Sequence, residues 1–360
     1  MNIGIDVRKI RDTGIGTYIR NILREMFEIN REDSFVLFGY PGDREVLSLP
    51  AERVTWVKNC SAKYSLMEHL SLPWMARRYG VDVFHAPHYT LPFFLTCRSV
   101  VTIHDLIHLQ FPEYLPTGFH RGYARIMTTA AAKKADLIIT VSENSRNDIK
   151  HLLGVDEEKV RVIYNGVEEK FFENKAGWTE KRDHILLVTS PKPHKNLEGA
   201  LRAFSMISNR ITQELIVAGE PPDNGSPIYD LIEKNGITDR VTFRGRLSGD
   251  ELRELYAGAL ILVSLSRYEG FGLPAIEAMA SGAAVVLSDV SSHPEVAGDA
   301  AILVDPDDTR GASEAMFRLI SDATLREEYI RRGFEQARRF SWKDAARKTL
   351  ECYRHHPSTG

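Results

Sequence analysis

The sequence predicts an α/β protein of two doubly wound domains separated by an interdomain cleft. Short apolar runs alternate with longer amphipathic ones, and this pattern is typical of a parallel sheet covered by helices on both faces. The alternation restarts after a polar stretch at residues 166–183, and 360 residues are too many for one ordinary core. Both domains are therefore expected to be Rossmann-like, with ligands bound beyond the carboxyl ends of their strands.

The elements follow from their hydrophobic periodicity. Apolar residues over 15–27 recur at the spacing of one helix face, which predicts a helix between the first two strands. We place the domains at 1–167 and 168–339, and expect a C-terminal helix at about 340–360 to pack back on the first domain. The predicted strands are 2–6, 34–40, 81–86, 99–105 and 135–142 in the first domain, and 184–190, 213–219, 240–245, 259–266 and 283–289 in the second.

Composition limits the class of protein. A hydrophobic content of 43% with 26% charged residues is typical of a globular protein, and a net charge of −3 argues against general nucleic-acid binding. Three cysteines without metal-ligand spacing indicate a reducing compartment. The chain begins on a strand pattern without a leader, and no apolar run is long enough to span a membrane. We expect a cytoplasmic protein, with peripheral membrane contact left open.

A glycine pair follows the first strand in "RDTGIGTYIRN". Gly14 and Gly16 precede the predicted helix, so backbone amides and the positive helix end could receive a phosphate. A dinucleotide motif would place a third glycine where Ile19 stands, which disfavours NAD. A plain strand-to-helix turn is the alternative.

Histidines follow two strands of the first domain. His104 and Asp105 in "VVTIHDLIHL" end a buried strand, where a histidine can donate to a sugar hydroxyl or a phosphate. His85 and His88 in "FHAPHYTLP" close another strand. Local backbone bonding is the alternative for His104, and a structural role is equally open for His85 and His88.

Two lysines follow the first strand of the second domain, in "TSPKPHKNLEGAL". Lys192 and Lys195 come just before a helical stripe that begins at Leu197. A cation is unfavourable beside the positive end of a helix, so an anionic partner is plausible. A solvated loop charge is the alternative.

The stretch "SRYEGFGLPAIEAMASG" places Glu269 and Glu277 on either side of a Gly-Phe-Gly-Leu-Pro turn. The amides of Phe271, Gly272 and Leu273 could donate to a phosphate, while the carboxylates accept from sugar hydroxyls. Together these groups predict a site for a nucleoside-diphosphate sugar. The alternative is a helix start in which Glu277 complements the helix dipole.

These segments, in this order, resemble the retaining GT-B glycosyltransferases of the mannosyltransferase-like family (family 4, group 1). The resemblance rests on the E-x7-E pattern of Glu269 and Glu277 and extends along almost the whole chain. The other matching segments are "TGIGTYIRNI", "TIHDLIHLQFPEY", "VIYNGVEEKF", "KPHKN", "SSHPEVAGDAAILVDPDD" and "FSWKDAA".

The resemblance implies a role for each candidate residue. Glu269 would hold the transferred sugar, Glu277 the ribose, and Lys195 the leaving phosphate. Gly14 would approach the diphosphate from the other domain, and His104 would lie near the sugar on the acceptor side. The loop around Leu247 would receive the base through its backbone, and the amides of Phe271, Gly272 and Leu273 would meet the sugar and diphosphate.

One departure from the family pattern concerns the first phosphate-binding position. The family usually has an arginine where this chain has Thr189 or Ser190. Either Lys192 takes over the charge, or the donor is held less tightly.

The resemblance also implies the chemistry. The donor would be GDP-mannose, with a UDP-hexose second, and the acceptor a growing polysaccharide or a lipid-linked glycan. No cofactor or metal is expected, because Lys195 would supply the positive charge and no Asp-x-Asp motif occurs. A nucleotide-sugar epimerase or hydrolase of similar fold, and a catalytically inactive scaffold subunit, are the rival hypotheses.

Residues 64–78, "YSLMEHLSLPWMARR", combine apolar side chains with Arg77 and Arg78, and Arg121 and Arg125 follow one turn apart on a predicted helix. This segment could dock on an anionic bilayer that carries a lipid-linked acceptor. A core helix with a charged end is the alternative.

Overall fold

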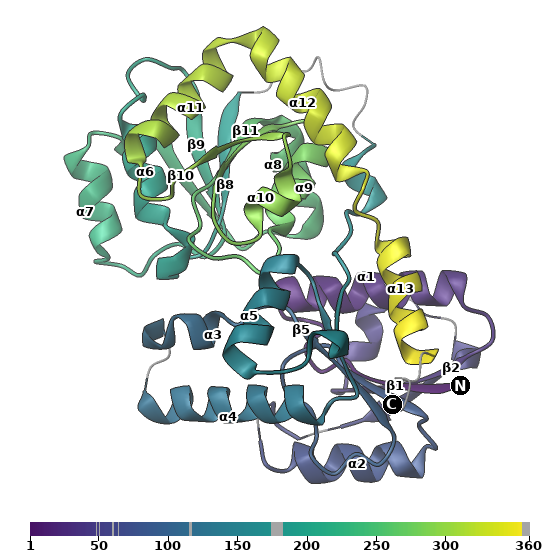
Figure 1. Cartoon of the computed structure of the whole chain (residues 1–360). Coiled ribbons are helices and arrows are strands. Elements are labelled where there is room, and N and C mark those ends of the chain that lie inside the picture. Colours follow the sequence, from purple (N-terminus) through teal and green to yellow (C-terminus); the bar gives the residue numbers. More distant parts are fainter. Residues whose placement is uncertain are drawn as a thin grey trace. The chain divides into compact units, whose positions relative to one another are not determined.

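The computed structural model describes residues 1–47, 49, 51–59, 61–63, 65–114, 117–173 and 183–354. The chain forms two compact units, of which the first comprises Met1–Gly166 with Ser341–Gly360 and the second comprises Val167–Phe340. Each unit contains a parallel sheet with helices around it (Figure 1). The predicted class of two doubly wound α/β domains is confirmed. Much of the predicted linker, residues 174–182, lies outside the described residues.

The described residues of the first unit form a seven-stranded sheet in the order β3-β2-β1-β4-β5-β6-β7, with each neighbouring pair parallel. Its central strands read as apolar runs because they are buried on both faces. The strands are β1 Asn2–Asp6, β2 Ser34–Gly39, β3 Val54–Lys58, β4 Val83–Ala86, β5 Arg98–Ile103, β6 Leu137–Thr140 and β7 Val160–Val162. The helices are α1 Gly14–Ile29, α2 Glu68–Arg78, α3 Ile107–Gln110, α4 Gly118–Lys134, α5 Glu143–Leu153 and α13 Trp342–Arg354.

The described residues of the second unit form a six-stranded parallel sheet in the order β10-β9-β8-β11-β12-β13. The strands are β8 His184–Val188, β9 Glu214–Ala218, β10 Val241–Gly245, β11 Ala259–Ser264, β12 Ala284–Ser288 and β13 Ala301–Val304. The helices are α6 Leu197–Ser205, α7 Pro227–Lys234, α8 Gly249–Gly258, α9 Leu273–Ala280, α10 His293–Ala297, α11 Thr309–Ser321 and α12 Ala323–Ala337.

Strand order positions the site in both sheets. The chain runs outward from β1 to β3 and then returns to pair β4 with β1. In the second sheet it runs from β8 to β10 and then returns to pair β11 with β8. At each return, the carboxyl ends of two neighbouring strands lead into loops that diverge, and doubly wound sheets bind ligands at this point.

The end of the chain completes the first unit. Helix α13 packs along α1, and both helices belong to that unit (Figure 1). The Tyr353 hydroxyl lies 2.7 Å from Nδ1 of His85, and Arg98 donates to the carbonyl oxygens of Cys352 and Tyr353. Residues 355–360, which the sequence included in this helix, lie outside the described residues.

Some predicted boundaries differ from the structure. Helix α1 begins at Gly14, so Gly14 and Gly16 lie in its first turn and do not precede it. Three strands were not predicted: β3, β7 and β13. β3 is an outer strand with a half-exposed pattern and β7 is only three residues long, so neither shows a clear apolar run. β13 is a short apolar run that the sequence analysis did not assign to a strand.

Segment 65–78 packs one side against the core and leaves the other side exposed. Leu72 and Ala76 of α2 are buried. The opposite side of the segment is exposed: Leu66 is 79% exposed, Met67 59%, Leu70 58% and Trp74 62%. Leu70 and Trp74 lie four residues apart on one face of α2, and Leu66 and Met67 directly precede the helix. We call these four exposed side chains the α2 stripe. Tyr64 lies outside the described residues.

Candidate functional site

Lys195 and Glu269, which lie 74 residues apart in sequence, form an ion pair in the second unit. Lys195 ends the short turn Pro193–Lys195 after β8, and Glu269 follows β11. The Nζ atom lies 2.7 Å from Oε1 and 2.8 Å from Oε2 of the carboxylate. Because β8 and β11 are neighbours, their carboxyl ends bring these two loops together. The structure thus joins two of the predicted site residues.

Glu269 is held in its ionised form. Burial by itself raises the pKa of its carboxyl group, but the charge of Lys195 and the hydrogen bonds from Lys195 and Ser266 outweigh it and keep the pKa below its ordinary value. The pair is only partly open to solvent, with side-chain exposures of 24% for Lys195 and 15% for Glu269. A permanent negative charge therefore stands beside a cation at neutral pH.

The Glu269 backbone is fixed by a short serine segment. Its N–H donates to Oγ of Ser291 at 3.1 Å, and its carbonyl oxygen accepts from the hydroxyls of Ser291 and Ser292. The turn then continues through Gly272 at φ +97°, where a Cβ atom would lie 3.1 Å from the His293 ring. This positive φ and the close histidine explain the glycine.

The His293 ring lies next to Gly272 of this turn. The sequence analysis missed this residue. The Ser288 hydroxyl donates to the carbonyl oxygen of Ser266 at 2.5 Å, so its oxygen accepts from Nδ1 of His293 at 2.8 Å. Burial lowers the pKa of His293, so the ring is neutral with its proton on Nδ1. Nothing in the sequence separated this residue from an ordinary core histidine.

The Lys195 loop is anchored by Asn196, another residue that the sequence analysis missed. Asn196 has φ +51°, and its Nδ2 donates to the carbonyl oxygens of Leu265 at 3.0 Å and Pro306 at 2.8 Å. Its Oδ1 accepts from the Gly199 N–H at the start of α6. An asparagine directly before a helical stripe is a helix-cap signal, so this residue could have been found.

Glu277 has different surroundings from Glu269. It lies on α9, and its Oε2 accepts a 2.9 Å hydrogen bond from the Tyr256 hydroxyl on α8. Burial raises the pKa of Glu277 to about 7, although the Tyr256 hydrogen bond acts in the opposite direction. One side of the turn therefore carries a fixed charge and the other a carboxyl group that titrates near neutral pH.

The remaining donor-side candidates lie at the ends of β8, β10 and β11. Ser190 follows β8, and Lys192 is exposed at the start of the Pro193–Lys195 turn. Leu247 lies in the turn between β10 and α8. Phe271 is buried and packs edge-on against Phe340 at 5.5 Å, so only its backbone can face a ligand, and Leu273 is the first residue of α9.

In the first unit, His85 and His88 have structural partners. His85 is buried between Oγ1 of Thr102 and the Tyr353 hydroxyl, each at 2.7 Å, and burial lowers its pKa to about 3. His88 bonds Asp6 at 3.3 Å and Thr90 at 2.7 Å. Both rings are thus held by the protein, and the acceptor-side role considered for them stays a prediction.

His104 is better placed for a ligand. Its Nε2 donates to the Pro87 carbonyl oxygen at 3.1 Å, and its ring lies edge-on to Tyr18 at 4.8 Å. Burial lowers its pKa to about 4, so the ring is neutral and Nδ1 is a hydrogen-bond acceptor. A ligand at His104 would therefore meet an acceptor at Nδ1, and the role of His104 on the acceptor side stays a prediction. Oδ1 of Asp105 accepts from the Ile107 N–H at 3.1 Å, which shapes the loop.

The two glycines of α1 differ. A Cβ atom on Gly16 would lie 2.5 Å from the Ile10 carbonyl oxygen, so packing requires this glycine. A Cβ atom on Gly14 would meet nothing within 4 Å, which leaves space at the helix start for a ligand to approach.

A buried ion cluster at the end of β1 was not predicted. Nη2 of Arg8 lies 2.7 Å from Asp6 and 2.9 Å from Glu68 on α2. Burial opposes ionisation of Asp6, but Arg8 and His88 hold its pKa well below the usual range. The cluster fixes the loop after β1 and the start of α2, next to His88.

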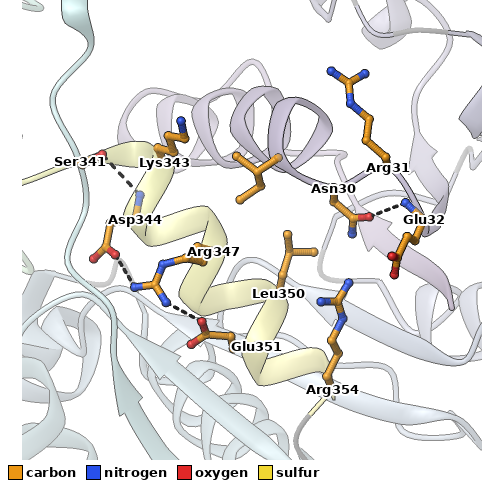
Figure 2. Close-up of a pocket in the computed structure, with 11 residues that line it drawn as sticks. Asn30, Arg31, Glu32, Ser341, Lys343, Asp344, Arg347, Leu350, Glu351 and Arg354 are labelled. Atoms are coloured by element: carbon orange, nitrogen blue, oxygen red, sulfur yellow. Dashed lines mark hydrogen bonds and ion pairs between the residues drawn. The ribbon is translucent and has the colours of Figure 1, made fainter.

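The described residues also form a surface hollow that is separate from the candidate site. The hollow, of about 840 Å³, lies between the end of α1 and α13, and the ion pairs of Arg347 with Asp344 and Glu351 cross its wall (Figure 2). It is lined by none of the candidate residues. Over the described part of the chain, no three His, Cys, Asp or Glu side chains gather as a metal site, and no helix could cross a membrane.

Known families and proteins match most of the chain. Residues 13–171 match the family described as Glycosyltransferase Family 4, and residues 168–336 match Glycosyl transferases group 1. The O-antigen chain mannosyltransferase B of Escherichia coli is 30% identical over 305 residues, covering 81% of this chain and 79% of that protein. The O-antigen chain mannosyltransferase RfbU of Salmonella typhimurium is 33% identical over 230 residues, covering 64% of this chain and 62% of that protein.

A solved structure shares the fold. The Anabaena protein HepE, in complex with UDP-glucose, superimposes with a TM-score of 0.77 and 17% identity, covering 98% of this chain and 99% of that one. At this identity the similarity concerns the fold alone.

Proposed function

The chain belongs to glycosyltransferase family 4 of the group 1 glycosyl transferases, and we propose that it moves a hexose, with mannose favoured, from a nucleoside-diphosphate sugar to a hydroxyl of a glycan or lipid-linked acceptor. The product would belong to a cell-surface polysaccharide of the lipopolysaccharide type. Two relatives named as O-antigen chain mannosyltransferases support both the sugar and the pathway class.

The Lys195–Glu269 pair is the observation that carries this proposal. The Lys195 ammonium, which could bind a leaving diphosphate, lies 2.7 Å from the Glu269 carboxylate, which could accept from sugar hydroxyls. The positive N-terminal end of α9 begins next to the same turn. A charged donor with a neutral sugar needs these two kinds of group side by side.

We infer a reaction that retains the anomeric configuration. The bond from the anomeric carbon to the diphosphate oxygen breaks, and the acceptor hydroxyl attacks from the same face. The leaving diphosphate takes the hydroxyl proton, so no protein nucleophile is required. Lys195 and the helix end stabilise the charge that develops on the diphosphate, usually the largest contribution in such catalysis.

Ligand binding can identify the nucleotide of the donor. HepE, with UDP-glucose bound, has the same fold, which keeps a UDP-hexose as the second donor candidate. Thermal unfolding would be followed with GDP, UDP, dTDP and ADP and their sugar derivatives. A ligand at 100 times its Kd adds about 2.7 kcal/mol to the free energy of unfolding, and we expect GDP and GDP-mannose to stand clear of the rest. No stabilisation by any of these ligands would contradict the proposal.

The rival activities are separable with the same donor. An epimerase or hydrolase would consume GDP-mannose without an acceptor, and an inactive scaffold would not turn it over with any acceptor. The proposed transferase needs both substrates and yields a glycosylated acceptor. Product analysis by mass spectrometry, with and without a lipid-linked glycan fraction, separates the three.

Membrane contact is proposed through the α2 stripe. Leu66, Met67, Leu70 and Trp74 are each more than half exposed, and the Arg78 guanidinium lies 5.5 Å from the centre of the Trp74 ring. Apolar side chains flanked by arginines suit the interface of an anionic bilayer. Such docking would bring the enzyme to a lipid-linked acceptor.

Vesicle flotation tests this contact. We expect the chain to float with vesicles of phosphatidylglycerol and phosphatidylcholine, and less with phosphatidylcholine alone. The double variant Leu70→Ser, Trp74→Ser should lose most of the bound fraction. Met206→Ser, which alters a methionine that is 49% exposed on the second unit, is the control. Equal flotation of the double variant and the wild type would rule out the α2 stripe.

A further inference from the structure

Tyr256 is a buried tyrosine in α8. Its side chain is fully buried, and its hydroxyl donates to Oε2 of Glu277 at 2.9 Å. Phe171 meets the Tyr256 ring edge-on with the centroids 5.7 Å apart. Helix α8 is itself fixed by a capping box between Ser248 and Glu251. The phenol is therefore held in one position against the carboxyl group.

We propose that Tyr256 is a positioning residue for the nucleotide ribose: it occupies Oε2 of Glu277 and reserves Oε1 for the ribose hydroxyls. Among the described residues, Oε2 is the carboxyl oxygen of Glu277 that a protein donor binds, and Glu277 is only partly buried. A carboxylate fixed at one oxygen presents the other at a defined angle. The inference rests on the proposed function, because the ribose role of Glu277 does.

The charged groups around Glu277 make this arrangement depend on pH. Burial raises the pKa of Glu277 to about 7, the Tyr256 hydrogen bond lowers it, Glu168 raises it and Lys170 lowers it. Glu168 and Lys170 pair with each other at 3.2 Å, so their effects largely offset. The ionised carboxylate accepts from both ribose hydroxyls, whereas the acid has lost an acceptor site. Affinity for a ribonucleotide should therefore rise as the pH increases through 7.

The experiment is a calorimetric titration of wild type and Tyr256→Phe with GDP and with UDP, from pH 6 to pH 9. The 2′,3′-dideoxy form of each nucleotide is titrated in parallel. The dideoxy form carries the same phosphates but no ribose diol. Its log Kd therefore changes with pH through the phosphates and through every protein group other than the one that faces the diol, and we subtract this change from that of the ribonucleotide. The remaining difference in log Kd reports Glu277.

We expect this difference to show a step near pH 7 in the wild type. Without the phenol the pKa of Glu277 rises, so Tyr256→Phe should bind the ribonucleotide about fivefold more weakly at pH 7 and nearly as well as wild type at pH 9. Tyr229→Phe is the matched control, because that hydroxyl donates to the Pro222 carbonyl oxygen on the same unit. It should keep the wild-type profile.

Glu277→Gln gives a second measurement that does not depend on Tyr256→Phe folding. Its amide oxygen still accepts from Tyr256, so the packing is kept while the titrating group is removed, and the step should vanish. A step that survives in Glu277→Gln would overturn the inference. So would a Tyr256→Phe profile that matches wild type at every pH. If wild type binds neither GDP nor UDP, the proposed function fails as well.

Discussion

The chain places two glutamates on either side of one turn and gives them opposite properties. Glu269 lies against a cation and is held ionised, whereas Glu277 lies against a neutral phenol and titrates near pH 7. The difference comes from what the fold packs against each residue, because both are largely enclosed. One end of this turn can thus be tuned without disturbing the other.

Removing the charge of Glu269 should separate chemistry from binding. In Glu269→Gln the shape is kept but Lys195 loses its partner at 2.7 Å and the sugar loses an ionised acceptor. We expect kcat to fall by about 10²–10³, as for loss of one preorganised electrostatic group, while the Kd for GDP changes by no more than about threefold. Initial rates with GDP-mannose and calorimetry with GDP measure the two quantities.

Glu198→Gln is the control for this prediction, since Glu198 is an exposed glutamate that pairs with Arg202 on α6. It should leave both constants unchanged. A Glu269→Gln enzyme that loses nucleotide affinity in proportion to its turnover would mean that Glu269 binds the nucleotide and not the sugar.

For single residues, the sequence identified the ionisable groups of the candidate site but not their hydrogen-bond partners. The spacing of Glu269 and Glu277 around a glycine turn and the lysine before a helix were visible as patterns. Tyr256 was not, because a tyrosine on the apolar face of a helix looks like any core residue until α8 packs against α9. Partners that come from distant segments leave no local trace in a sequence.

Among the elements, most continuous apolar strands and long amphipathic helices were predicted, whereas the outer strand β3 and the three-residue strand β7 were not. Strand β3 lies at the edge of its sheet with Val57 as its one buried residue, and β7 spans three residues. Strand order could not be predicted, because it depends on where the chain reverses and not on local periodicity. That reversal is what brings Lys195 and Glu269 together.

Gly166 packs against the start of α13 and should not tolerate a side chain. Gly166 follows β7, and a Cβ atom there would lie 2.0 Å from the backbone nitrogen of Trp342, the first residue of α13. Gly166→Ala must therefore displace the start of that helix. We expect a loss of about 1–3 kcal/mol in the free energy of unfolding, measured by urea denaturation.

Gly122→Ala provides the comparison. Gly122 lies in α4, and a Cβ atom there would meet nothing within 4 Å, so alanine should be neutral or add up to about 1 kcal/mol through its helix propensity. Equal stability of the two variants would contradict the close packing at Gly166.

For the whole molecule, the two units should respond differently to acid. In the first unit burial lowers the pKa of His85 to about 3 and of His104 to about 4, and it also lowers those of His69 and His88. Below the ordinary histidine pKa of about 6.5, the unfolded chain binds protons that the folded unit does not. The first unit therefore loses stability as the pH falls from about 6.5.

The second unit is expected to be less sensitive over the same range. His293 acts in the same direction, but Glu277 acts in the other, because its folded pKa of about 7 lies above that of the unfolded chain. Its folded form gains protons as the pH falls from 7. We would measure the melting temperatures of the two units by calorimetry at pH 7.5 and pH 5, with deuterium exchange to assign the transitions. At pH 5 the first unit should melt at a lower temperature than the second. Earlier melting of the second unit would contradict this.

The first unit is made from both ends of the chain, while the second comes from one continuous stretch, and this affects how the protein is made. A ribosome delivers residues 167–340 before α13 exists, so the second unit can fold while the first still lacks the helix that covers α1. His85 likewise waits for Tyr353, which emerges almost last. A nascent chain that stops short of α13 would thus carry a finished Lys195–Glu269 pair on a protein whose other half is incomplete, so premature release yields no complete enzyme.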